Sequence, residues 1–201
     1  FCTAERQYRA PVPYGSQRAP TAQWTATAAG CCVLAAQSDG PYLTHATRGR
    51  IVDLGVTDAA NMGAAMAPAA HDTLSALFRD TATSPEDYDL IVTGDLGELG
   101  HRLLVELFRR DGVTLGENCT DCGILLYDRL RQDMHAGGSG CGCSAAVLNG
   151  YLLHGLRAGK WQRMVFAPTG ALLSPTSSFQ GESVPGICHA VVLSRTKEAL
   201  G

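Results

Sequence analysis

The feature that most constrains the fold is a glycine-rich stretch with the sequence HAGGSGCGCSAA at residues 135–146. Glycine tolerates positive φ and lets another backbone or a ligand approach closely. The apolar residues that follow recur at helical spacing: Val147, Leu148, Tyr151, Leu152 and Leu156. We therefore predict a tight turn that runs directly into a helix.

A turn of this kind offers unpaired backbone N–H groups at a helix start, where an anion such as a carboxylate binds well. The candidate ligand-binding residues of this turn are His135, Gly137, Gly138, Ser139, Gly140 and Cys141. A thiol at a helix start is also more acidic than a free cysteine. From spacing alone, a tight turn with two small buried thiols is the simpler interpretation, and the rest of the chain must decide.

Composition excludes several classes of function. The chain has 201 residues, a net charge of −3 and a pI near 6.1, without a basic run, so a nucleic-acid partner is not expected. The sequence has no apolar stretch long enough to span a membrane and no signal-peptide pattern. It begins at Phe1 rather than Met, in what is predicted to be a loop, so we expect a fragment or a processed piece.

The eight cysteines are expected to be reduced thiols in a cytoplasmic-type environment, because nothing in the sequence indicates export. Cys119 and Cys122 followed by Cys141 and Cys143 resemble a four-thiolate zinc site, but the second pair has only one intervening residue. No metal site is therefore predicted. Cys31 and Cys32 begin a segment that is predicted to be a buried strand, where their thiols would serve as small apolar side chains.

Apolar periodicity predicts an α/β fold with a mixed sheet covered by helices. Strands are predicted at residues 21–27, 31–36, 43–49, 89–93, 163–168 and 187–193. Helices are predicted around residues 68–78, 102–110 and 147–160, and residues 123–127 fit a strand or a helix. Ligands of such sheets bind beyond the strand ends. The loops 93–100, 133–143 and 169–176 are therefore expected to converge on one face.

Longer motifs occur in a fixed order along the chain. They are TAERQ at 3–7, DLGVTD at 53–58, MGAAMAPAA at 62–70, DYDLIVTGDL at 87–96, AGGSGC at 136–141 and TGALLSPT at 169–176. With these motifs the chain resembles the stage V sporulation protein AD family, a branch of the thiolase-like superfamily from endospore-forming bacteria. The resemblance implies a fold of two similar βαβαβαββ halves. Residues 1–37 would be the tail of the first half and residues 38–201 the whole second half.

The same resemblance bears on catalysis. In condensing enzymes of this superfamily, a first-half cysteine attacks, and two loops of the second half supply a histidine with a second histidine or an asparagine. The corresponding loops here contain Asp95 and Glu98 in one, and His135 with Ser139 and Cys141 in the other. An ionised Asp95 would oppose a developing oxyanion. We therefore expect no catalytic residue, and Asp95 joins the candidate ligand-binding set.

The resemblance further implies a non-catalytic protein that binds dipicolinic acid, a pyridine dicarboxylate, with or without calcium, and takes part in its uptake into the developing spore. No cofactor is expected. The implied partners are other stage V sporulation membrane channel proteins, and the implied location is peripheral at the inner spore membrane. A homodimer is expected, because apolar surface around 26–34 and 64–70 should be exposed.

Two alternatives remain open at this point. One is an acyltransferase of the thiolase-like class that uses Cys141 or Cys143 as its nucleophile. The other is a structural piece without a ligand of its own.

Overall fold

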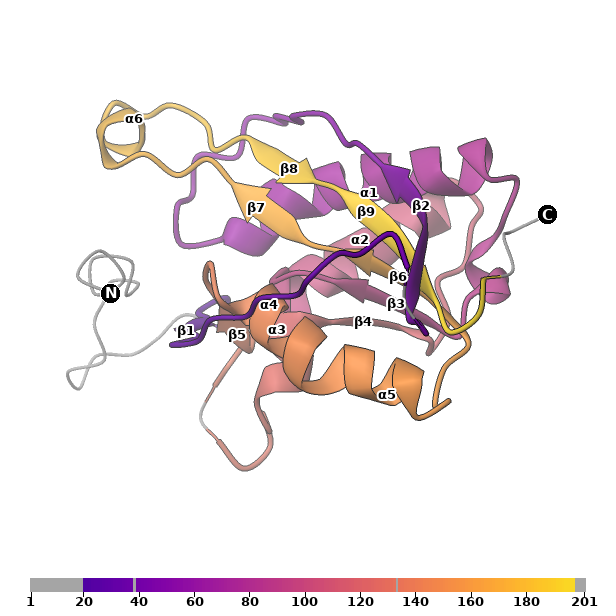
Figure 1. The fold of residues 1–201 in the computed structure, drawn as a ribbon. Coiled ribbons are helices and arrows are strands. Elements are labelled where there is room, and N and C mark those ends of the chain that lie inside the picture. The colour runs from indigo at the N-terminus through magenta and orange to yellow at the C-terminus, as the bar shows by residue number, and fades with distance from the viewer. Residues whose placement is uncertain (1–19, 38, 133, 198–201) are drawn as a thin grey trace.

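A computed structural model describes residues 20–37, 39–132 and 134–197, and its centre is a five-stranded mixed sheet. The strands are β2 (Tyr42–Thr47), β3 (Leu90–Thr93), β4 (Cys119–Asp121), β6 (Arg163–Ala167) and β9 (Ala190–Ser194). They lie in the order β2-β9-β6-β3-β4 (Figure 1). β3 is parallel to β4 and β6, whereas β9 is antiparallel to β2 and β6.

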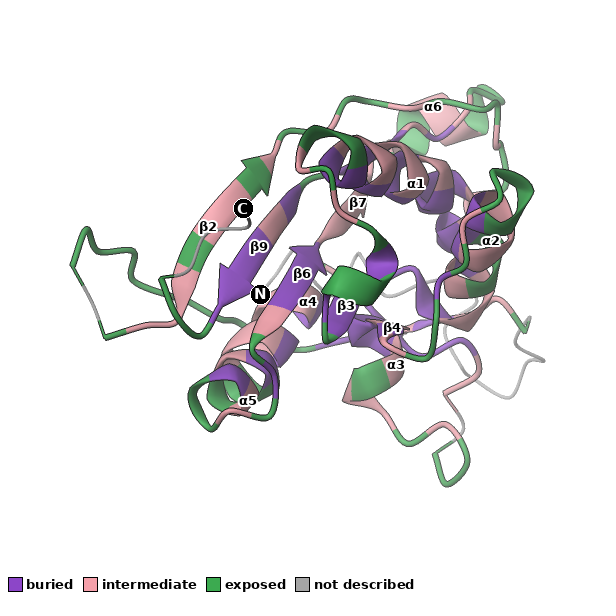
Figure 2. Cartoon of the chain, turned by 90° about the vertical axis from the view of Figure 1, so that its right-hand side faces the viewer, coloured by how far each residue is buried: buried purple, intermediate pink, exposed green. Residues whose placement is uncertain are grey.

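Helices cover both faces of this sheet (Figure 1). On one face lie α1 (Met62–Asp80) and α2 (Gly97–Arg110). On the other lies a continuous helical segment made of α4 (Cys143–Val147), the π-helical turn η3 (Leu148–Leu152) and α5 (Leu153–Arg157). Because side chains alternate along a strand, Ile91 of β3 packs toward α1 and α2, while Leu90 and Val92 pack toward α4 and α5. The central strands are accordingly buried on both faces (Figure 2).

Shorter elements complete the described chain. They are β1 (Trp24–Thr25), η2 (Pro85–Asp87), α3 (Cys122–Leu126), β5 (Gly138–Ser139), β7 (Thr169–Ala171), α6 (Pro175–Phe179) and β8 (Gly186–Cys188). β1 pairs in parallel with β5 and so ties the start of the described chain to the glycine-rich turn. β7 and β8 form an antiparallel pair, so the first residues of the loop predicted at 169–176 form a strand, and the strand predicted at 187–193 is divided between β8 and β9.

The order of the large elements confirms the predicted fold class. From Tyr42 to Ser194 the chain runs β2, α1, β3, α2, β4, the α4–α5 helical segment, β6 and β9, with the β7–β8 pair inserted before the last strand. This is the βαβαβαββ order expected of one thiolase-like half. The boundary between residues 37 and 38 remains a prediction.

Helix α1 begins at Met62, six residues before the predicted start at Pro68. Asn61 caps the helix, because its side chain accepts a hydrogen bond from the Ala64 N–H at 3.2 Å. Pro68 lacks an N–H and removes one hydrogen bond inside the helix. Burial of the alanine-rich and methionine side chains around it offsets that loss, so tertiary packing overrides the local signal.

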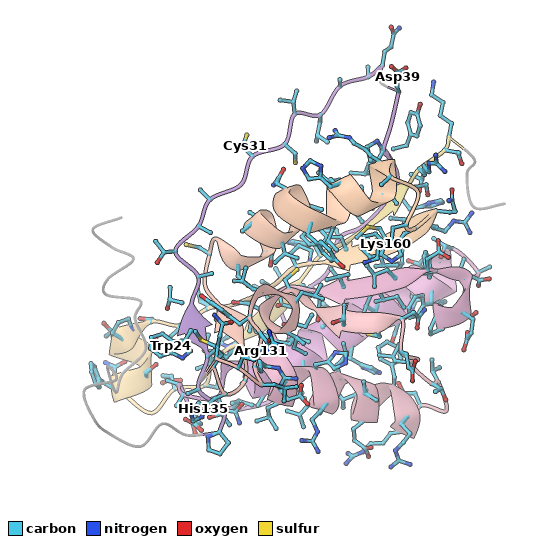
Figure 3. All side chains as sticks on the ribbon, turned by 90° about the horizontal axis from the view of Figure 1, so that it is seen from below. Trp24, Cys31, Asp39, Arg131, His135 and Lys160 are labelled. Atoms are coloured by element: carbon cyan, nitrogen blue, oxygen red, sulfur yellow. The ribbon has the colours of Figure 1, made fainter. Side chains whose placement is uncertain are left out.

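The strand predicted over residues 31–36 is wrong. The structure places these residues in an extended stretch without strand pairing, where Val33 is 90% and Leu34 is 78% exposed. Gly30 touches the start of the α4 segment, and Figure 3 shows Cys31 on the trace that passes beside it. Strand propensity needs a paired neighbour, and the described residues supply none here. Apolar surface was expected to be exposed around residues 26–34 and 64–70. This prediction is confirmed at 27–34 but is wrong at 64–70, because these residues lie largely buried in α1.

Helices α1 and α2 pack closely against each other at two glycines, Gly63 and Gly100. A Cβ added at Gly63 would lie 2.6 Å from the Leu96 carbonyl oxygen and 2.9 Å from the Gly100 Cα. A Cβ added at Gly100 would lie 2.7 Å from the Gly63 Cα. The backbones of α1 and α2 therefore touch directly, and this contact fixes α1 against the loop that follows β3.

We predict that Gly63→Ala lowers the free energy of unfolding by about 1–3 kcal/mol, because the methyl group meets rigid backbone rather than a side chain that can move. Gly150→Ala is the matched control, since a Cβ at this helical glycine would meet nothing within 4 Å. The control should be neutral or stabilising by up to about 1 kcal/mol. Urea denaturation of both variants measures the difference, and equal midpoints would contradict the close contact.

Candidate functional site

The three loops expected to converge do meet, and Asp95 lies at their junction. Asp95 follows β3, Ser139 and Gly140 belong to the glycine-rich turn, and Thr169 begins β7. The Asp95 Oδ2 accepts hydrogen bonds from the Ser139 hydroxyl and the Gly140 N–H, both at 2.9 Å. Its Oδ1 accepts one from the Thr169 hydroxyl at 3.2 Å. The predicted convergence is therefore confirmed.

The glycine-rich turn thus binds an anion, and that anion is the protein's own carboxylate. Asp95 is only 8% exposed, and it takes up the Gly140 N–H that the sequence offered to a ligand. The Gly137 N–H is also used, because it donates to the Met134 carbonyl at 2.7 Å. The turn is therefore held in place from within, by charge-assisted hydrogen bonds.

Gln23 strengthens the same junction and was missed in the sequence. Its buried amide Nε2 donates to the Asp95 carbonyl at 2.9 Å and to the Gly138 carbonyl at 3.1 Å. The residue stands just before β1, among small polar and aromatic residues that give no periodic signal. The Gln23 amide therefore joins three parts of the chain: the segment that leads into β1, the loop that follows β3, and strand β5.

A second carboxylate, Asp121, lies fully buried beside this junction. Its Oδ1 accepts from the N–H groups of Gly97 at 3.0 Å and Gly123 at 2.9 Å. Its Oδ2 accepts from the Thr93 hydroxyl at 2.7 Å and the Leu96 N–H at 3.0 Å. Asp121 thereby caps the start of α2 from outside that helix and also serves as the N-cap of α3.

Asp121 was not predicted from the sequence, although a signal for it exists. An aspartate directly before the small apolar run that starts at Cys122 is typical of an N-cap. The pKa of Asp121 is raised to about 6. Burial is the main cause and the negative charge of Asp95 adds to it, while the hydrogen bonds from Thr93, Gly97 and Leu96 act in the opposite direction. The junction thus holds two buried carboxylates.

The glycines of this turn allow the backbone of the turn to contact the backbone of neighbouring segments directly. Gly137 and Gly140 have φ values of 103° and 107°, in the region that glycine favours. A Cβ at Gly123 would lie 2.2 Å from the Gly138 carbonyl oxygen, and one at Gly142 would lie 2.0 Å from the Ala28 carbonyl oxygen. The glycine-rich sequence is therefore explained by close packing of the turn against α3 and residue 28.

The predicted site residues fall into two groups. Asp95, Ser139 and Gly140 are hydrogen-bonded to one another, and Gly137 and Gly138 are buried in the same turn. His135 is half-buried with a φ of 43°, and Figure 3 shows it at the margin of the molecule, on the same side as Trp24. Cys141 is exposed. The sequence also offers Arg6 as a cation that could pair with Asp95, and this residue lies outside the described residues.

The thiols do not gather into a metal centre. Within the described ranges, no group of three or more His, Cys, Asp or Glu side chains is placed to hold a metal ion. Cys141 is exposed, whereas Cys119, Cys122 and Cys143 are buried, and burial raises the pKa of Cys119 and of Cys143 to about 12. Across those same ranges no helix is long and apolar enough to cross a membrane.

The element order and the sheet topology define an α/β protein with a mixed sheet covered by helices on both faces. The sequence model of the family "Stage V sporulation protein AD" matches residues 1–194. The chain belongs to this family.

One curated protein agrees with that assignment. Stage V sporulation protein AD of Bacillus subtilis (strain 168) is 45% identical over 193 residues, which are 96% of this chain and 57% of that protein. The chain thus spans little more than half the length of this curated relative. Among solved structures, 3-oxoacyl-[acyl-carrier-protein] synthase III from Aquifex aeolicus VF5 matches with a TM-score of 0.43 and 13% identity, covering 79% of this chain and 55% of that chain.

We predict that Asp121 makes stability depend on pH. Its folded pKa of about 6 lies above the unfolded value of about 3.9, so the folded state holds the proton more tightly. The stability that this group contributes is fully present below about pH 4 and is lost as pH rises through about 6, a change of roughly 3 kcal/mol.

Asp121→Asn should remove this pH dependence of stability. The variant also loses a hydrogen bond because the Leu96 N–H is left unpaired, but that loss lowers the free energy of unfolding equally at every pH. Urea denaturation between pH 4.5 and 7.5 should show the wild-type and variant curves converging or crossing, rather than running parallel. Glu86→Gln, at an exposed carboxylate, is the control and should run parallel to wild type. Parallel curves for Asp121→Asn would contradict the raised pKa.

We predict that iodoacetamide modifies native cysteines in two classes. Cys31, Cys32 and Cys141 are exposed and should react within minutes at pH 8. Cys119, Cys122, Cys143 and Cys188 are buried with raised pKa values and should react only on unfolding. Mass spectrometry of tryptic peptides measures both classes, and early labelling of Cys143 would refute the burial of α4.

Proposed function

We propose that this chain is part of a non-catalytic thiolase-like protein that binds dipicolinic acid and takes part in its uptake into the developing spore. The observation that carries the proposal is the buried Asp95 carboxylate, bound by Ser139 and Gly140 at the strand-end junction. Family membership supplies the biological setting, sporulation.

The case against catalysis rests on charge. Claisen condensation develops an oxyanion, which needs neutral or cationic donors aimed at it. The loop after β3 instead provides Asp95, and Asp121 adds a second carboxylate directly behind it with a pKa of about 6. The Gly140 N–H and Ser139 hydroxyl that are suited to an oxyanion already bind Asp95. Both features favour a binding protein over a condensing enzyme.

Dipicolinate carries two carboxylates, so the negative charge of Asp95 must be neutralised when the ligand binds nearby. Carboxylate oxygens are the ligands that calcium prefers, so dipicolinate arriving with Ca²⁺ could face Asp95 without repulsion. The proposed contacts from the turn are His135, as a side-chain donor, and the backbone around Gly137, Gly138 and Cys141. Calcium is here part of the cargo.

The proposed setting follows from the family. The protein would be peripheral at the inner spore membrane, in a reducing compartment, and would act with other stage V sporulation membrane channel proteins. A homodimer remains part of the proposal, because residues 27–34 expose apolar side chains such as Val33 and Leu34.

A second candidate function is acyl transfer by a cysteine thiol. One observation favours it: Cys141 is exposed in the turn directly before α4. Cys143 is a poor nucleophile, because burial raises its pKa to about 12. Alkylation of Cys141 much faster than that of Cys31 at pH 6 would favour this candidate.

The test of dipicolinate binding is calorimetric titration of the chain, alone and co-expressed with a polypeptide that supplies the remaining part of a family member. We expect weak binding by the chain alone and stronger binding by the pair. Ca²⁺ should strengthen binding to wild type, and Asp95→Asn should abolish that gain, because the amide removes the negative charge that the ion would neutralise.

Two histidine variants locate the site. His135→Asn keeps a residue that tolerates positive φ and should weaken binding about fivefold or more, since a charge-assisted hydrogen bond is lost. His154→Asn, at an exposed position of α5, is the matched control and should bind as wild type does. Equal affinity of both variants would remove the glycine-rich turn from the proposed site.

A further inference from the structure

A polar groove lies between the edge strand β2 and the second half of α1, on residues that take no part in the Asp95 junction. Its volume is about 650 Å³. Residues 45–50 line one wall, and Asp72, Thr73, Ala76 and residues 79–81 line the other. Figure 2 shows β2 at the margin of the sheet, with β9 on its inner side.

The edge of β2 is open. β2 pairs with β9 and with no other strand of the described chain, so the backbone groups on its outer side have no ladder partner there. The register shifts between Leu43 and His45, which blunts the first part of the edge. From His45 to Thr47 the pairing is regular, and consecutive residues here line the groove, as expected where a strand presents its edge. An added strand would therefore lie beneath α1.

The charge of the groove favours an acidic occupant. It contains Arg48, Arg50 and Arg79 against Asp72 and Asp80. Arg50 binds Asp72 through Nε and Nη2, and Arg79 binds Asp80 through Nε at 2.9 Å. Each guanidinium has five N–H donors, so both can bind a further carboxylate. Arg48 is exposed and forms no ion pair with any described carboxylate.

Arg48 and Arg50 lie on either side of Gly49, whose backbone is tightly packed. Gly49 packs so tightly that a Cβ there would lie 1.8 Å from the Cys188 carbonyl oxygen and 2.3 Å from the Thr73 hydroxyl. Its N–H donates to His189 Nδ1 at 3.1 Å. Residues 48 and 50 therefore extend from a backbone segment that is fixed against α1 and the end of β8, which lowers the entropy cost of binding.

We propose that this groove docks an extended acidic segment of a partner protein, which adds a strand to the edge of β2 and places carboxylates against Arg48 and Arg79. Main-chain hydrogen bonds to residues 45–47 supply affinity, and the arginines select for acidic side chains. The proposal is independent of dipicolinate binding, because no residue of the groove belongs to the Asp95 junction.

The test uses the whole chain and two labelled, acetylated hexapeptides, one of alternating glutamate and valine and one of alternating lysine and valine. Fluorescence anisotropy should show binding of the acidic peptide that weakens with salt. The double variant Arg48→Glu/Arg79→Glu should weaken it by on the order of tenfold or more. Arg102→Glu, at an exposed arginine of α2, is the control and should leave binding within about twofold of wild type.

Hydrogen exchange supplies a second readout. If a strand is added, amides among residues 45–47 should gain protection when the acidic peptide is bound, whereas those of α2 should not. Absence of binding, equal binding of the lysine peptide, or equal loss in Arg102→Glu would overturn the proposal. So would a self-associated chain that Arg48→Glu/Arg79→Glu converts to monomer, because the occupant would then be a second copy.

Discussion

The buried carboxylate of Asp121 is the interaction on which the rest of the strand-end architecture depends. It gathers four donors from β3, the start of α2 and the start of α3, and so fixes how three elements leave the sheet. Asp95 then extends the same arrangement to the glycine-rich turn and to Thr169. An isolated buried charge would be strongly unfavourable, and only this complete set of donors makes it tolerable.

This arrangement changes the meaning of the glycine-rich turn. Its composition is typical of a site for an external anion, yet its strongest contacts are to an internal one. Two carboxylates give this region an electrostatic character that disfavours a developing oxyanion. Binding of a dianionic cargo is compatible with this character only when a cation or a proton accompanies the cargo, which links the proposed function to ionic conditions.

The sequence predicted those parts of the fold that local periodicity determines. Strands β3 and β6, helix α2 and the meeting of Asp95 with the glycine-rich turn were anticipated because apolar spacing and loop position specify them. Pro68 misled the prediction of α1, since burial outweighs one missing hydrogen bond. Gln23 was missed because its contacts come from residues far apart in the sequence, which no local pattern reveals. Asp121 has a local N-cap signal before α3, but its contacts with Leu96 and Gly97 join distant parts of the sequence and give no such signal.

The contact between Gly63 and Gly100 has a consequence for how this family can vary. In an ordinary core contact, a larger side chain on one helix can be accommodated by a smaller one on its neighbour. Here neither helix has a side chain left to shorten, so no compensating exchange exists between the two positions. A larger residue at either position should therefore be poorly tolerated, and a change at the other position should not rescue it.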